Sequence, residues 1–185
     1  MDRKEELTIR AKKLDEKYGD QFEITADKFQ EQYNKFILET EGENYFQIIL
    51  RTHLYIEFEM TETLKSKLLH PEELGDKLAF NVALKILLAI GAIPLELKAP
   101  INFLNRIRNK YAHELDFQFD EETFRKFLDS FVEGFDKNVD SFRDGSKDYS
   151  LLESLKRVLF SLWVALIGYR LISEDIATEL ENLFK

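Results

Sequence analysis

Residues 102–113 gather side chains that could transfer protons and bind an anion. The stretch holds three asparagines, two arginines and one of the chain's three histidines, namely Asn102, Asn105, Arg106, Arg108, Asn109 and His113. Histidine can take or give a proton near neutral pH, the arginine fork matches phosphate oxygens, and an asparagine amide can orient either group. Cleavage of RNA by internal attack would need such groups, because a base, an acid and a cation must act around one phosphorus atom.

The spacing of these residues predicts a helix that starts near Pro100. At 100° per residue, its apolar arc consists of Ile101, Leu104, Ile107, Tyr111, Ala112 and Leu115. A polar stripe beside the arc consists of Asn105, Asn109 and His113, with Asn102 and Arg106 close to it. Arg108 falls inside the apolar arc and therefore needs a partner. Because asparagine is a poor helix former, helix propensity does not explain three of them here.

Arg108, Asn109 and His113 together resemble the R-x4-H motif of the HEPN superfamily. In that family the motif lies on a late helix of an all-α bundle, and in many members it cuts RNA without a metal ion. The flanking sequence is similar to the branch that includes the mannitol operon repressors, over residues 51–64, 78–93 and 101–113. The resemblance implies an all-α, HEPN-like helical bundle with its core at about 45–136 and additional N- and C-terminal helices.

The resemblance also suggests roles for individual residues. Arg108 and His113 would be catalytic and Asn109 would orient them, with supporting or substrate-binding positions at Asn105, Arg106, His53 and Glu57. One histidine cannot readily act as both base and acid in a single step, and HEPN proteins work as dimers, so we expect a homodimer that pairs two motifs. HEPN toxins paired with nucleotidyltransferase antitoxins carry a tyrosine two positions after the histidine. This chain has Leu115 there, so control by modification of that tyrosine is not expected.

The composition favours a single all-α domain over residues 1–185. The chain is 44% apolar and includes 16 phenylalanines, which is enough for one sizeable core. Seven glycines and three prolines leave few breaks, which favours long helices over the frequent turns of a β protein. The chain has no cysteine, and its histidines show no metal-binding spacing, so we expect neither a metal nor a cofactor.

The charge and hydropathy patterns bear on partners and location. A net charge of -9 argues against a broad nucleic-acid footprint, although a small cleft can still be basic. The charged N-terminal residues do not form a secretory signal. The most apolar run, Val158 to Tyr169, is shorter than the ~20 residues that cross a bilayer. We therefore expect a cytoplasmic protein with no membrane segment.

Apolar periodicity divides the whole chain into helices. They are expected at residues 2–18, 25–40, 45–69, 78–92, 100–115, 120–135, 151–172 and 173–184, with a polar loop at 137–149. The last two would form a C-terminal hairpin at about 150–185. Apolar residues cover nearly the whole wheel of 45–69, so this helix should be central and buried along most of its length.

His53 and Glu57 lie one turn apart on that central helix. A histidine and a carboxylate at this spacing can share a hydrogen bond, and Glu57 could instead pair with a buried arginine such as Arg108. The simplest interpretation is a polar pair satisfied inside the core. For Arg108 and His113 the corresponding interpretation is a structural arginine bonded to a carboxylate, beside a surface histidine.

Three functions remain open at this point. The first is a metal-independent endoribonuclease with a toxin or defence role, acting on RNA as a homodimer and controlled by a protein such as an antitoxin. The alternative is a non-catalytic interaction protein or transcription regulator resembling the mannitol operon repressors, which would bind its partner through its acidic surface and the apolar run at 158–169. The third is a small-ligand pocket in which Arg108 binds a phosphate or carboxylate.

Overall fold

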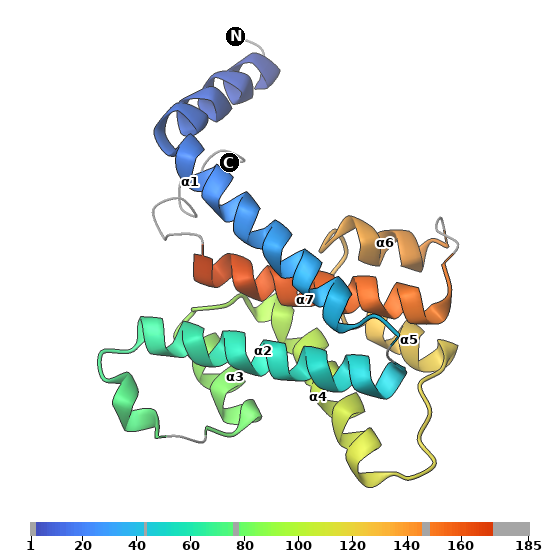
Figure 1. Cartoon of the computed structure of the whole chain (residues 1–185). Coiled ribbons are helices and arrows are strands. Elements are labelled where there is room, and N and C mark those ends of the chain that lie inside the picture. The colour runs from blue at the N-terminus through green and yellow to red at the C-terminus, as the bar shows by residue number, and fades with distance from the viewer. Residues whose placement is uncertain (1–2, 43, 76–77, 146–148, 172–185) are drawn as a thin grey trace.

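The chain folds into helices packed around one core (Figure 1). The computed structural model describes residues 3–42, 44–75, 78–145 and 149–171, and all regular structure within them is helical. This confirms the all-α class. No helix in these ranges is long and apolar enough to cross a membrane.

Helix α1, Arg3–Glu39, is continuous, and its N-terminal part projects away from the body of the molecule (Figure 1). The expected division into two helices at 2–18 and 25–40 is therefore wrong. The residues between them include Gly19 but no proline, and one glycine weakens a helix without breaking it. Near its C-terminal end, α1 packs on α7, Leu151–Leu171, through Phe36, whose fully buried ring lies 5.7 Å from that of Trp163.

Helix α2, Tyr45–Lys67, packs against α7 and also against α3 and α4. It starts with a capping box, in which the side chains of Asn44 and Gln47 each accept a hydrogen bond from the other's backbone N–H at 3.0 Å. Phe46, Leu54 and Phe58 form an exposed strip along α2, although the Phe46 ring lies 5.4 Å from that of Tyr111 on α4. Buried residues run from Ile48 to Leu64, so α2 is central and buried along most of its length, as expected, although this strip stays exposed.

Helices α3, Phe80–Ala89, and α4, Lys98–His113, follow two short 3-10 turns, η1 at Pro71–Leu74 and η2 at Leu95–Leu97. The buried face of α4 consists of Pro100, Ile101, Phe103, Leu104 and Ile107. Phe103 was not expected there, whereas Ala112 and Leu115, both expected in the arc, are exposed. Leu115 falls outside the helix because the backbone becomes extended at Glu114, where α4 has ended.

The region after α4 differs most from the sequence prediction. Helix α5, Glu121–Leu128, has the expected N-cap, since Asp120 accepts from the backbone N–H of Thr123 at 2.8 Å, but it ends seven residues before the expected 135. Helix α6, Lys137–Arg143, occupies the segment expected to be a loop. Most of the apolar run of α7 is buried, and the second helix expected at 173–184 lies outside the described residues.

Candidate functional site

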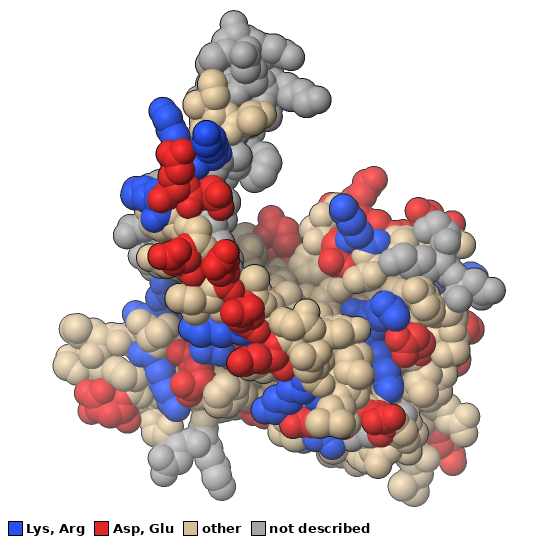
Figure 2. Space-filling model, turned by 45° about the horizontal axis from the view of Figure 1, so that its top comes forward, with Lys and Arg blue, Asp and Glu red and all other residues tan. Residues whose placement is uncertain are grey.

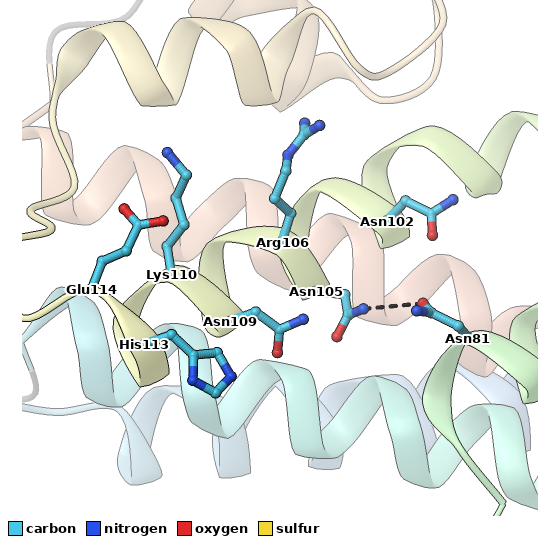
Figure 3. A pocket seen from close by; sticks show the side chains of 8 residues that line it. All are labelled: Asn81, Asn102, Asn105, Arg106, Asn109, Lys110, His113 and Glu114. Atoms are coloured by element: carbon cyan, nitrogen blue, oxygen red, sulfur yellow. Dashed lines mark hydrogen bonds between the residues drawn. The ribbon is translucent and has the colours of Figure 1, made fainter.

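An open groove of about 450 Å³ follows the exposed side of α4 (Figure 3). Its lining consists of Asn81, Asn102, Asn105, Arg106, Asn109, Lys110, His113 and Glu114. All of these except Asn81, which lies on α3, come from α4 or the residue after it. The i, i+3 and i+4 spacing of a helix therefore brings most of the lining into one row.

The structure places five of the predicted site residues in this groove, namely Asn102, Asn105, Arg106, Asn109 and His113. It adds Lys110, which the same helical periodicity could have identified, because it lies one turn after Arg106. It also adds Asn81, which lies on another helix, α3. Its contact with the site depends on how α3 packs on α4, which local periodicity does not specify.

His113 is exposed at the last residue of α4 and lines one end of the groove. In Figure 3 its ring points to the same side of α4 as the amides of Asn105 and Asn109. Arg106 and Lys110 point to the other side of the same row. A ligand lying along α4 would therefore meet the imidazole and amides on one side and the two cations on the other.

Arg106 and Lys110 lack acidic partners in the described part of the chain. The Arg106 guanidinium lies 4.6 Å from the centre of the Phe103 ring, and the Lys110 ammonium lies 5.0 Å from that of Phe117. No carboxylate described here comes within ion-pair distance of either cation, although Glu114 also lines the groove. Like charges four residues apart on a helix repel each other and destabilise it slightly. An anion bound beside Arg106 and Lys110 would reduce this repulsion, so the pair favours anion binding.

Arg108 is not among the side chains that line the groove. Its side chain is only partly exposed, and its Nη1 donates a hydrogen bond to Oδ1 of Asn109 at 3.1 Å. The partner expected for this arginine was a carboxylate such as Glu57, but no ion pair joins these two among the described residues. Arg108 therefore contacts the groove through the amide of the residue that follows it.

His53 lies behind the groove and is buried, with 4% of its surface exposed. Its Nε2 is 2.9 Å from Oδ1 of Asn105, and its ring stacks on Phe80 with 4.3 Å between centroids. The anticipated His53–Glu57 hydrogen bond does not form, because the imidazole faces α4 instead. Nδ1 of His53 is also buried, and no hydrogen-bond partner for it exists among the described residues.

The surroundings of His53 favour its neutral form. Burial lowers its pKa below the ordinary value of 6.5, since the charged imidazolium is poorly solvated in the core. The hydrogen bond to Asn105 and the negative charge of Glu57 act in the opposite direction, and the positive charge of Arg108 adds to the lowering. Neither His53 nor Glu57 lines the groove, although His53 contacts it through Asn105.

No family model, curated protein or solved structure matches this chain. Within the described residues, no three His, Asp or Glu side chains are grouped so that they could hold a metal ion. The surface seen in Figure 2 carries acidic and basic side chains side by side, including along α1.

Proposed function

We propose that this protein is a metal-independent endoribonuclease of the HEPN type, with RNA bound along the α4 groove. The observation that carries the proposal is the position of His113 in one open groove with Arg106 and Lys110, two cations without carboxylate partners in the described residues. The chain as a whole has a net charge of -9, so two unneutralised cations at one site favour a specific anionic ligand.

The chemistry assigned to each group follows from its position. Arg106 and Lys110 would bind the phosphodiester and stabilise the negative charge that develops on the phosphorane. His113 would take the proton of the 2′ hydroxyl or protonate the leaving oxygen. Arg108 was expected to act on the phosphate itself, but its contact with Asn109 favours a role behind the groove.

A second copy of the chain would complete this mechanism. Internal attack requires a base on one side of the phosphorus and an acid on the other, and one histidine cannot readily serve as both in a single step. His113 is exposed at the end of its helix, so a two-fold dimer could bring two copies of it to one phosphate. We propose the homodimer, a cytoplasmic toxin or defence role, and an antitoxin-like protein partner as parts of this function.

Cleavage of a labelled total-RNA pool in the presence of a chelator tests the proposal. Wild type should cleave RNA, and His113→Ala should lose that activity while melting at the same temperature. His70→Ala is the matched control, because His70 is an exposed histidine beside η1 and does not line the groove. Lack of cleavage by wild type at high concentration, or equal cleavage by His113→Ala, would contradict the proposal.

The alternative function is a non-catalytic interaction protein or regulator similar to the mannitol operon repressors. One observation supports it, namely an exposed apolar strip on α2. The apolar run at 158–169 was its expected docking surface, but most of that run is buried in the core. The exposed strip of α2 is the better candidate, because Leu54 is 53% exposed and Phe58 is 57% exposed. If the alternative is correct, Leu54→Ser with Phe58→Ser removes partner capture, and His113→Ala does not.

A further inference from the structure

We propose that His53 and Arg108 are positioning residues, which bind the amide oxygens of Asn105 and Asn109 from behind so that the groove presents N–H donors to its ligand. This inference rests on the proposed function, since it concerns how the same groove recognises a phosphodiester. It gives both residues a defined task that does not require either to touch the substrate.

The orientation of the Asn109 amide follows from the chemistry of arginine. A guanidinium carries only donors, so the Asn109 atom 3.1 Å from Nη1 of Arg108 must be the oxygen. The NH2 group of the same amide then points away from Arg108. Because Asn109 lines the groove and Arg108 does not, the bond uses the amide's acceptor and leaves its donors for a ligand.

The orientation of the Asn105 amide follows from two bonds that support each other. Its Nδ2 donates to Oδ1 of Asn81 at 3.0 Å, so its Oδ1 faces Nε2 of His53, which must carry the proton. Reversal of the Asn105 amide would require the proton to move to Nδ1 of His53, where no acceptor lies within reach among the described residues. A buried N–H without an acceptor is rare and costly, which favours the observed arrangement.

Asn81 completes the pattern on α3. Its oxygen accepts the bond from Asn105, so its own NH2 group remains available at the end of the groove (Figure 3). The NH2 groups of the three asparagine amides and the cations of Arg106 and Lys110 together form a surface of hydrogen-bond donors. Glu114 is the one carboxylate in the lining, at the end near His113. Phosphodiester oxygens only accept hydrogen bonds, so they are the ligand groups that this arrangement fits.

Substitutions of Arg108 separate positioning from a simple structural role. Arg108→Met removes the donor, so the Asn109 amide can turn and offer its oxygen to the ligand. Arg108→Lys retains a donor of similar reach. Affinity for a non-cleavable 2′-O-methyl RNA oligonucleotide, measured by fluorescence anisotropy in chelator, should fall about tenfold in Arg108→Met and recover to within about threefold of wild type in Arg108→Lys.

The equivalent pair for the buried histidine is His53→Met and His53→Gln. Glutamine can donate to Asn105 and should preserve binding, whereas methionine cannot. Melting temperatures are measured for all four variants, so that binding is compared only between folded proteins. Equal affinity of wild type and Arg108→Met, or equally weak binding by the methionine and conservative variants at both positions, would overturn the inference.

A second readout separates this inference from the proposed function. Side-chain NH2 resonances of Asn81, Asn105 and Asn109 are followed by NMR during titration with inorganic pyrophosphate. Shifts of these resonances in wild type, smaller in Arg108→Met, would support the donor surface even if no RNA is cleaved. RNA cleavage with unchanged binding in the Arg108 and His53 variants would support the function and reject the inference, and no response to RNA or pyrophosphate would reject both.

Discussion

Glu59 on α2 accepts a hydrogen bond from Nε of Arg170 on α7 at 2.6 Å and a second from Nη2 at 3.4 Å. The Glu59 side chain is almost completely buried, with 3% of it exposed, while 28% of the Arg170 side chain is exposed. The pair joins two helices that pack directly on each other. Because a buried charge needs a partner, the Glu59–Arg170 ion pair holds α7 in position against α2, in addition to their apolar packing.

Arg170→Ala should lower the free energy of unfolding by roughly 3 kcal/mol, because it leaves the Glu59 carboxylate buried and unpaired. The double variant Glu59→Leu with Arg170→Leu should recover much of this loss, since it removes both charges together. Urea denaturation of the three proteins measures the effect. An equal loss in the single and double variants would show that the two charges are not coupled.

The sequence predicted the part of the site that lies on one helix. Pro100, the apolar arc and the polar stripe of residues 102–113 are close in sequence, so helical periodicity alone places Asn105, Asn109 and His113 together. The helix at 45–69 was also predicted close to its observed bounds of Tyr45–Lys67. Both predictions succeed because they depend on the spacing of apolar and polar residues along a single helix.

The features that the sequence missed depend on contacts between distant residues. Asn81 reaches the groove through the packing of α3, and His53 finds Asn105 on another helix rather than Glu57 on its own. The backbone oxygen of Leu128, the last residue of α5, accepts a hydrogen bond from Arg143, fifteen residues later. Periodicity describes one helix at a time and does not specify which polar groups meet across helices.

Arg143 stabilises the turn that follows α5. Its guanidinium donates to the backbone oxygens of Leu128, Phe131 and Val132 just after the helix ends, and those of Leu128 and Val132 also accept from the backbone N–H groups of Phe131 and Phe135. Arg143→Ala should therefore cost about 2 kcal/mol of stability, and Arg143→Lys should recover only part of it, because an ammonium lacks the planar fork. Hydrogen exchange at residues 128–135 provides the measurement. Unchanged protection there in Arg143→Ala would contradict this role.

Arg106 and Lys110 should govern RNA affinity and its dependence on salt. Replacement of both by alanine should weaken binding of the non-cleavable oligonucleotide and reduce the slope of log K against log salt by about 1 for each lost phosphate contact. Stability should change by only a few tenths of a kcal/mol, because the two like charges repel each other slightly. Anisotropy titrations at several salt concentrations test this prediction.

The matched control for that experiment is Arg125→Ala with Lys126→Ala. These two cations are exposed on α5 and do not line the groove, and the double replacement removes the same total charge. The control should bind RNA nearly as well as wild type, with nearly the same salt slope. If both double variants lose affinity equally, net charge rather than the groove controls binding.

The lowered pKa of His53 predicts how stability depends on pH. The unfolded chain holds a proton on this imidazole up to about its ordinary pKa of 6.5, while the folded protein resists protonation to lower pH, chiefly because the ring is buried. The unfolded state therefore binds more protons in this window, and stability falls as the pH drops below 6.5. Above that value both states are neutral, and His53 adds no pH dependence.

His53→Gln isolates this contribution from the carboxylates that also titrate in acid. Glutamine preserves a donor for Asn105 but has no proton to gain, so the difference in melting temperature between pH 7.5 and pH 5.5 should be smaller in the variant than in wild type. His70→Gln is the control, because it removes an exposed imidazole in place of the buried one. Identical pH profiles for wild type and His53→Gln would show that the buried imidazole does not carry the effect.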